Sequence, residues 1–301
     1  MYEQIASNKR RSAALIAGFV VLLALVGAAI SWVIGYGPIG IVVALVISGA
    51  LAFGSYWKSD SIALAVSRAR PADPQEYRRL YNLVDGLCIA SGLPQPKVYI
   101  IDDPAPNAFA TGRNPKHASI AVTSGLLTMM NRVELEGVIA HELSHVKNYD
   151  ILVSTLAVTM VGAVALVSDL VIRTMWWNGG RTRRSGDRND SNNPLALIGF
   201  VILILAPIAA KVMQLAVSRR RESLADFSAV HMTRYPPGLI SALEKLQADN
   251  TITHSASRAT AHMWIEQPTP REEGEGRLRW LNKMFDTHPP LEERIAALRE
   301  L

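Results

Sequence analysis

The chain of 301 residues has very little cysteine and, over one long stretch, no charge at all. Cys88 is its only cysteine, which excludes an intramolecular disulfide and a cysteine zinc cluster and fits a reducing compartment. Charged residues make up 19% of the chain, against roughly 25% in soluble domains. Between Ser12 and Trp57 there is no Asp, Glu, Lys or Arg. This clustering is typical of a membrane protein.

The uncharged stretch is long enough for two membrane-spanning helices, since each needs about 20 apolar residues. Gly35–Pro38 (GYGP) lies near its middle and supplies a turn. We therefore predict a membrane hairpin over residues 1–57 instead of a cleaved signal peptide, because a second apolar run follows at once. Basic residues flank both ends, so the positive-inside rule places the N-terminus and the chain after Trp57 in the cytoplasm. They are Lys9, Arg10, Arg11, Lys58, Arg68 and Arg70.

The net charge of +5 is explained by such residues next to the membrane. No module that combines aromatic and basic residues accompanies it, so no nucleic-acid partner is expected. Residues 58–150 are predicted to form the first cytosolic region. An amphipathic helix is expected over Pro74–Pro94, and β-rich segments bounded by turn residues predict strands at Lys97–Ile101 and Ser119–Thr123. Asn131 followed by Glu134 resembles a capping box, which starts a helix running through His145.

Two further apolar runs, Ile151–Ser168 and Pro194–Ala210, predict a second membrane-associated hairpin over residues 151–217. Both runs are short for a span, and the polar loop between them is net basic. If both cross the bilayer, that loop conflicts with the positive-inside rule. The hairpin therefore either spans the membrane or lies shallowly against protein. Residues 218–301 are polar and mostly helical in pattern, and they are predicted to form the second cytosolic region.

The candidate catalytic motif is H-E-x-x-H, formed by His141, Glu142 and His145. In a helix, positions four residues apart lie on one face, so the two imidazoles can bind one metal ion. Glu142 points to the side, where its carboxylate can take a proton from a water that the metal activates. Two surface histidines on a solvated helix are the alternative, and the predicted helix and its capping box favour the metal site.

A catalytic zinc usually has three protein ligands and one open position. Glu222 is the preferred third ligand, and Asp226, four residues later on a predicted helix, can accept the free N–H of a ligating histidine. The other reading is a solvated acidic pair beside three arginines. Position favours the ligand, because a membrane hairpin returns the chain to the side that it left. The histidine candidates for the third ligand are His117, His231, His254, His262 and His288.

With these residues placed, the chain resembles the HtpX-type membrane metallopeptidases, which belong to a larger group that includes the prenyl-protein (CAAX) proteases. The resemblance covers nearly the whole chain. It rests on the N-terminal hairpin and on four motifs in the same order. They are PNAFATG (Pro106–Gly112), VIAHELSHVKNYD (Val138–Asp150), SRRRESLAD (Ser218–Asp226) and THPPLEERIAAL (Thr287–Leu298).

The resemblance implies a mainly α, multi-pass membrane protein with a cytosolic α+β metalloprotease domain of the gluzincin-like type. It implies a zinc endopeptidase, with one zinc per chain, in the bacterial plasma membrane with its active site in the cytoplasm. Its partners would be the lipid bilayer and misfolded, unassembled or damaged membrane proteins, which it would cleave in quality control and stress response. Cooperation with other membrane proteases is also expected.

Further site residues follow from the resemblance alone. Asn107, Ala108 and Phe109 would line the substrate cleft, where an extended peptide can add to a sheet edge; an ordinary turn and core strand is the alternative. His288 and Arg294, six residues apart, would lie near the scissile carbonyl and stabilise its developing charge. Alternatively, His-Pro-Pro only begins a helix.

Two other functions share some of these features. A protease that trims prenylated or other lipid-linked peptides would use the same zinc chemistry, but four apolar runs are few for a large intramembrane chamber. A non-enzymatic membrane scaffold with a structural zinc is disfavoured by the intact Glu142 and by the three evident ligands. Zinc itself is inferred from ligand type, and manganese or cobalt can bind similar sites.

Overall fold

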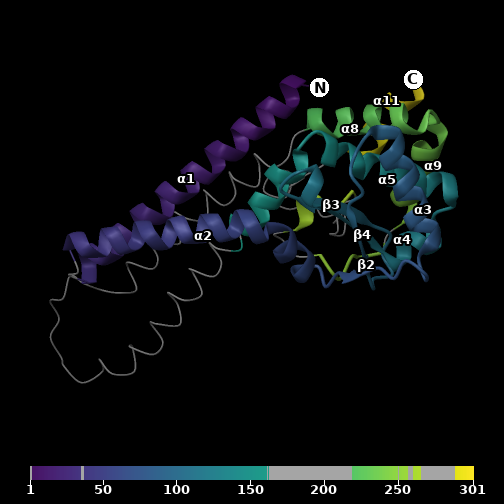
Figure 1. Ribbon diagram of the computed structural model, residues 1–301. Helices are drawn as coiled ribbons and strands as arrows, with labels where there is room; N and C mark the ends of the chain where they lie inside the picture. The colour runs from purple at the N-terminus through teal and green to yellow at the C-terminus, as the bar shows by residue number, and fades with distance from the viewer. Residues whose placement is uncertain are drawn as a thin grey trace, which may run out of the picture.

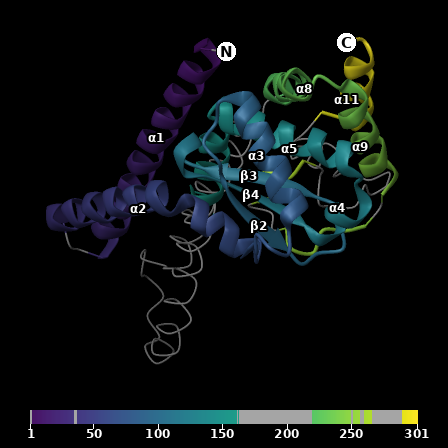
Figure 2. The ribbon, with the colours of Figure 1, turned by 45° about the vertical axis from the view of Figure 1, so that its right-hand side comes forward.

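The computed structural model describes residues 2–34, 37–160, 162, 219–249, 251–256, 260–265 and 289–301. Two long helices, α1 (Tyr2–Ile34) and α2 (Gly37–Val66), form an arm that projects from a globular part (Figures 1 and 2). Both therefore occur where the sequence predicts the first hairpin. Residues 35–36 of the predicted turn lie outside the described residues.

The arm is anchored by a helix that begins at Asp150 and continues through Met160. Apolar side chains of this helix, including Leu156, form a buried cluster with Leu15 and Phe19 of α1 and with Ala52 of α2. In the part of the chain that the structure describes, no helix is both long enough and apolar enough to cross a membrane. The rest of the predicted second hairpin, from residue 163 to 217, lies outside the described residues, so that prediction stays untested.

A four-stranded mixed sheet forms the centre of the globular part, with strand order β1-β2-β4-β3. Strand β2 pairs in parallel with β4, and the outer strands β1 and β3 pair antiparallel to their neighbours. The strands are β1 (Arg70–Pro71), β2 (Lys97–Ile101), β3 (Ala108–Gly112) and β4 (Ala118–Thr123). The two strands predicted from β-rich composition are confirmed as β2 and β4, the latter one residue longer than expected.

Both faces of β3 and β4 are buried, and successive strand residues alternate between the two faces of the sheet. Val98 and Ile100 of β2 join the main hydrophobic core. Ile101, on the opposite face, packs with Phe109 and with Trp264, which lies just after a short 3-10 helix, η2 (Ala261–Met263). Because β3 is apolar on both faces, its sequence lacks the polar and apolar alternation that marks a half-exposed strand.

Helices cover the face of the sheet that carries the main core. Helix α3 confirms the amphipathic helix predicted over Pro74–Pro94, and the capping box of α5 is confirmed as well, since Asn131 and Glu134 exchange hydrogen bonds. The helices of this part are α3 (Arg78–Ser91), α4 (Ser124–Met129), α5 (Arg132–Lys147), α8 (Arg219–Thr233), α9 (Pro236–Ala248) and α11 (Leu291–Arg299). Helix α5 packs against α3, α8, α9 and β3, so the motif helix lies in the middle of the domain.

The contact between α5 and α9 is close and partly polar. A Cβ atom on Gly137 of α5 would lie 2.8 Å from the backbone nitrogen of Leu239 in α9, so the two backbones meet where no side chain fits. At the start of α5, the buried Glu134 accepts hydrogen bonds of 2.7 Å from both Ser241 and Lys245 of α9. These contacts fix the position of α5, which carries both histidines.

Candidate metal centre

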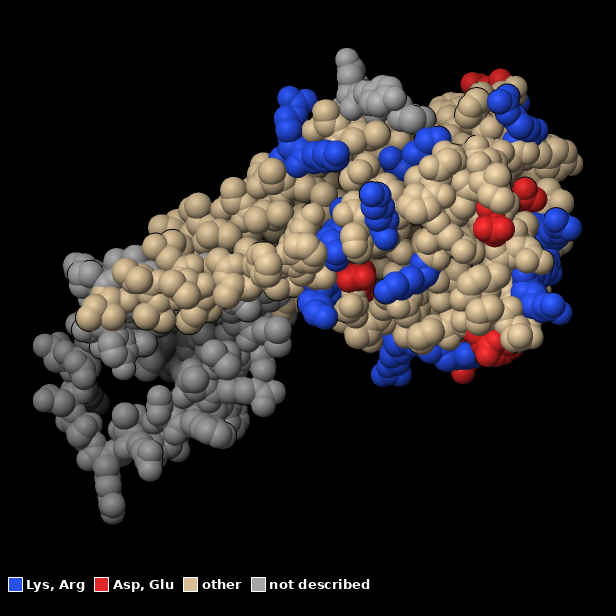
Figure 3. Space-filling model, in the orientation of Figure 1, with Lys and Arg blue, Asp and Glu red and all other residues tan. Residues whose placement is uncertain are grey.

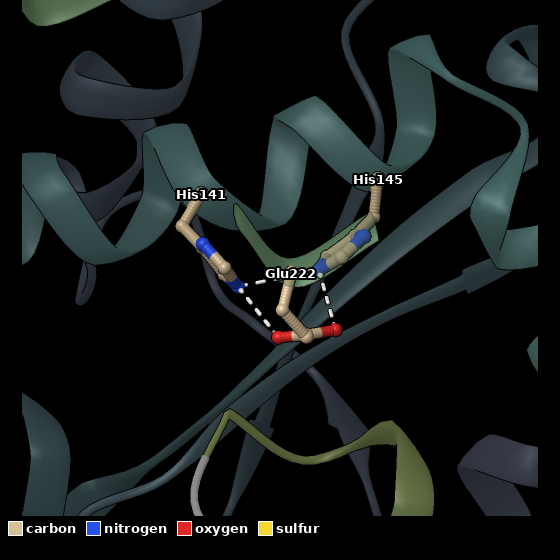
Figure 4. Close-up of side chains that lie close together, drawn as sticks. All are labelled: His141, His145 and Glu222. Carbon is tan, nitrogen blue, oxygen red and sulfur yellow. Dashed lines mark hydrogen bonds and ion pairs between the residues drawn. The ribbon is translucent and has the colours of Figure 1, made fainter. Parts of the chain in front are cut away.

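Two histidine side chains point from the same face of α5 towards one point, as Figure 4 shows. His141 and His145 are one helical turn apart, and their Nε2 atoms are separated by 3.2 Å. In a tetrahedral zinc site with bonds of about 2.05 Å, ligand atoms lie about 3.3 Å apart. The spacing of the two nitrogens therefore suits one shared metal ion.

Glu222 of α8 faces the two histidines from the opposite side (Figure 4). Its two carboxylate oxygens lie 3.7 Å from the Nε2 atoms of His141 and His145. Candidate ligand atoms of the three residues all lie within 4.8 Å of one another. The structure thus brings together the three residues predicted as ligands, and the donor set of two imidazoles and one carboxylate fits zinc.

The remaining ring nitrogen of His141 contacts Asp226, one turn further along α8. Nδ1 of His141 lies 2.9 Å from Oδ1 of Asp226, which leaves Nε2 facing the other ligands. Arg294 of α11 donates from Nε and Nη2 to the two carboxylate oxygens of Asp226, at 2.9 and 2.7 Å. Asp226 therefore occupies the position that the sequence predicts for it, and Arg294 holds it there.

His145 has a corresponding carboxylate that sequence reasoning missed. Nδ1 of His145 lies 3.2 Å from Oδ2 of Asp150, which is 3% exposed. Such a contact fixes the tautomer of a ligating histidine and the orientation of its ring. Asp150 ends the quoted motif VKNYD, but it lies beyond the end of α5, so helical periodicity gives no reason to place it beside His145.

The charges around the site favour an ionised Asp226. Burial raises the pKa of Asp226, but Arg294 and His141 lower it more, to about 2. Burial and the guanidinium of Arg294 lower the pKa of His141, whereas Asp226 and Glu222 raise it to about 9. The pKa of His145 is raised too, because Glu222 and Asp150 outweigh burial. Since metals bind the deprotonated imidazole, metal binding at this site releases protons.

Glu142, the predicted general base, follows His141 on α5 and is 2% exposed. Its carboxylate is close enough to Arg294 to raise the pKa of that guanidinium. It thus lies in the same buried, charged environment as the ligands. Its role as the base stays a prediction.

The predicted substrate-binding segment is buried inside the domain. Asn107 is 1% exposed, and Ala108 and Phe109 are fully buried, with the rings of Phe109 and Trp264 in an edge-to-face contact. The outer edge of β3 also has partners: the N–H of Ile265 donates to the carbonyl of Ala108 at 3.0 Å. In this conformation the three side chains pack in the core, and their role in substrate binding stays a prediction.

The last predicted site residues lie on the segment that ends in α11. His288 lies outside the described residues, and α11 begins directly after Pro290, as the alternative reading of this segment expected. The guanidinium of Arg294 is engaged with Asp226 and lies 3.5 Å from Nε2 of His141. It is therefore near the metal-binding point, and its proposed contact with the scissile carbonyl stays a prediction. Among the other histidines, His262 lies 3.0 Å from the carbonyl of Ser154, away from the ligand group.

A buried and a partly buried histidine on one helix, a carboxylate from a second helix and a glutamate beside the first histidine form an arrangement typical of a metallopeptidase site. Residues 74–301 match the sequence model described as "Peptidase family M48". That match covers more than half of the chain, which therefore belongs to peptidase family M48 and is a metalloprotease.

Similar proteins are found over the full length of the chain. It is 42% identical to the "Protease HtpX homolog" of Streptococcus uberis, with 100% of both chains covered. It is 43% identical to the protein of the same description from Thermoanaerobacter pseudethanolicus, covering 100% of this chain and 98% of the other. A crystal structure of S. mikatae Ste24p is similar with a TM-score of 0.49 and 20% identity, covering 99% of this chain and 67% of that one.

Proposed function

We propose that this protein is a zinc endopeptidase of the bacterial plasma membrane, with one zinc ion per chain. In this proposal it cleaves misfolded, unassembled or damaged membrane proteins at the cytosolic face, as part of membrane-protein quality control and the stress response. Other membrane proteases would act on the same substrates. The similarity to proteins described as HtpX proteases supports the proteolytic part, because it extends over the whole chain.

One observation carries the proposal, namely the convergence of His141, His145 and Glu222 on one point. Both imidazoles turn Nε2 towards this point because carboxylates occupy the opposite nitrogens. This arrangement needs no rotation of either ring to accept a metal, so the ligands are preorganised.

Zinc bound there would act as a Lewis acid, lowering the pKa of water and polarising the peptide carbonyl. We assign Glu142 the proton transfers: its carboxylate accepts a proton as water attacks the carbonyl and passes it to the leaving amine nitrogen. Asp226 and Asp150 keep the rings of His141 and His145 in place. Arg294 keeps Asp226 ionised, so that the ring of His141 keeps its acceptor.

The arm supports a location in the membrane. Large apolar side chains of α1 and α2 are exposed, among them Leu25 at 63%, Ile39 at 75% and Val46 at 66%. An apolar surface of this extent on a single chain marks contact with a membrane or a protein. Figure 3 shows no charged side chain on the outer part of the arm, and it shows Lys and Arg side chains, with an acidic one among them, where the arm meets the globular part. Basic residues next to an apolar segment favour the cytosolic side for the site.

The first test is cleavage of casein, as an unfolded substrate, by the zinc-loaded full chain in detergent. Glu142→Gln is expected to bind zinc and to lose at least about 100-fold in activity, because a general base contributes 10²–10⁴-fold. Glu222→Ala is expected to lose both zinc and activity. Glu136→Gln removes the same charge from the same helix, away from the ligand group, and is the matched control. Casein cleavage by Glu142→Gln at the wild-type rate would exclude the proposed base.

The second test addresses the side of the membrane. Replacing the buried Cys88 by serine and placing a new cysteine at the exposed Lys97 gives a single reporter in the domain. A membrane-impermeant maleimide is expected to label it in inverted membrane vesicles and not in intact spheroplasts. Labelling in spheroplasts alone would place the domain outside and would contradict this part of the proposal.

A further inference from the structure

The first two turns of α1 lie against the turn that follows the motif helix α5. The side chain of Asn8 is 1% exposed, and its amide nitrogen donates two hydrogen bonds into this turn. One goes to the carbonyl of Asn148 at 2.8 Å and the other to Oδ1 of Asp150 at 2.6 Å. The two contacts join residues that are at least 140 positions apart in the sequence.

Asp150 connects Asn8 to the metal centre. While Oδ1 of Asp150 accepts from Asn8, Oδ2 lies 3.2 Å from Nδ1 of the ligand His145. A carboxylate held at both oxygens has one orientation, and here that orientation faces the imidazole. The chain of contacts therefore runs from α1, through one buried carboxylate, to a predicted metal ligand.

The turn itself needs support from outside. Tyr149 has a φ of +60°, a left-handed conformation that a non-glycine residue adopts only at an energetic cost. Lys9, the neighbour of Asn8, places its ammonium 4.5 Å from the centre of the Tyr149 ring. Adjacent residues of α1 thus contact Tyr149 and both of its neighbours, and these contacts favour the conformation that aims Asp150 at His145.

We infer that Asn8 is a positioning residue for the metal centre and that it acts on His145 through Asp150. The inference rests on the proposed zinc site. An asparagine suits this position because its amide has two N–H donors, and both are used here. It follows that α1 is part of the support of the active site, so a displacement of the arm from the domain would loosen a zinc ligand.

The test measures zinc affinity directly, in the full chain in detergent, by competition with a chromophoric chelator. Loss of a partner behind a ligating histidine typically weakens metal binding 10–100-fold, which is the expectation for Asp150→Asn. Asn8→Ala acts one step further away and is expected to weaken binding about 3–10-fold. It should also change the visible absorption spectrum of the cobalt-loaded protein and lower kcat with KM unchanged.

A double-mutant cycle separates action through Asp150 from a general effect on packing. In the Asp150→Asn background, Asn8→Ala is expected to change zinc affinity less than about twofold. Ser12→Ala is the matched control, because Ser12 lies one turn later on α1, is buried, and its hydroxyl makes no hydrogen bond in the described part of the chain. This variant is expected to keep the affinity and the cobalt spectrum of the wild type.

Three results would overturn the inference: wild-type zinc affinity and cobalt spectrum in Asn8→Ala, an equal loss with and without Asp150, or the same loss in Ser12→Ala. If Asn8→Ala does not fold, the isosteric Asn8→Asp replaces it. In Asn8→Asp a carboxylate faces that of Asp150 and cannot donate a hydrogen bond to it when ionised. Unchanged zinc binding in this variant would therefore equally overturn the inference. Failure of the wild type to bind zinc or to cleave casein would instead refute the proposed function.

Discussion

Arg294 and Asp226 form a buried ion pair with two hydrogen bonds directly behind the ligand His141. Their side chains are 1% and 5% exposed. A charge buried to this degree requires its partner, because removal of one member leaves the other without compensation in the protein interior. Helix α11 at the C-terminal end of the chain therefore supports both the fold and the metal centre.

Arg294→Gln should lower the free energy of unfolding by about 3–5 kcal/mol, the usual cost of breaking a buried ion pair. Chemical denaturation of the zinc-free full chain in detergent measures this change without a contribution from the metal. The double variant Arg294→Gln/Asp226→Asn, which removes both charges, should recover part of the loss. The stability of the double variant is compared with the sum of the two single effects. If the double variant is less stable than this sum predicts, Asp226 is not the partner that makes Arg294 necessary.

Zinc should stabilise the folded protein through its three ligands. A ligand that binds only the folded state adds RT ln(1 + [L]/Kd), about 2.7 kcal/mol when the zinc concentration is 100 times Kd. Thermal unfolding should therefore shift to higher temperature when zinc is added to the metal-free wild type and shift back with chelator. The same addition should shift Glu222→Ala much less and Glu136→Gln as much as the wild type. An equal shift in Glu222→Ala would remove Glu222 from the ligand set.

The contact of Glu134 with α9 predicts a dependence of stability on pH. Burial raises the pKa of Glu134, but hydrogen bonds from Lys245, Ser241 and the backbone of Asn131 lower it more. A carboxyl group with a lowered pKa in the folded state stabilises the protein above its unfolded pKa, about 4.3, and loses this contribution as the pH falls through the folded pKa. Glu134→Gln should therefore lower the free energy of unfolding by about 1–2 kcal/mol at pH 7. The difference in this free energy between the variant and the wild type should shrink below about pH 4.3.

The free energy of unfolding is measured for the wild type and for Glu134→Gln at each pH, and the difference between the two is compared. Protonation of the metal ligands in acid affects both alike, so it cancels in the difference. Glu136→Gln, two residues further on α5, removes the same charge and is the matched control. If the difference in free energy of unfolding between Glu134→Gln and the wild type stayed constant from pH 7 to pH 3, the ionisation of Glu134 would not contribute to stability as proposed.

Local periodicity was sufficient to predict which candidate site residues lie side by side on the same helix. Residues four apart on a helix share a face, which places His141 beside His145 and Glu222 beside Asp226. The capping box at Asn131 follows from local hydrogen bonding in the same way. The prediction that α8 lies beside α5 depended on interpreting residues 151–217 as a hairpin. A hairpin returns the chain to the side that it left, which places Glu222 on the same side as His141 and His145.

Contacts across turns and between distant segments could not be predicted in this way. Asp150 reaches His145 only because Tyr149 adopts a left-handed conformation, and nothing in the pattern of apolar residues indicates it. Asn8 comes from a helix that the sequence marks only as a membrane segment. The pairing of Arg294 with Asp226 was not predicted, and the contact of Arg294 with the substrate carbonyl stays a prediction. A charge pattern on one helix does not show which buried partner lies opposite.

The close crossing of α5 and α9 gives the last prediction. A methyl group on Gly137 would lie 2.8 Å from the nitrogen and 2.9 Å from the Cα of Leu239, both backbone atoms that cannot rotate away. Gly137→Ala must therefore separate the two helices, at a cost of about 1–3 kcal/mol. Because His141 lies one turn further along α5, we expect this shift to weaken zinc binding as well.

Gly86→Ala is the matched control for that substitution. Gly86 lies within α3, is exposed, and a Cβ atom there would meet nothing within 4 Å. Alanine favours helix over glycine by about 1 kcal/mol, so Gly86→Ala should raise the melting temperature while Gly137→Ala lowers it. If both substitutions stabilised the protein, helix propensity would dominate at both positions, and the crossing of α5 and α9 would have to be looser than the 2.8 Å approach indicates.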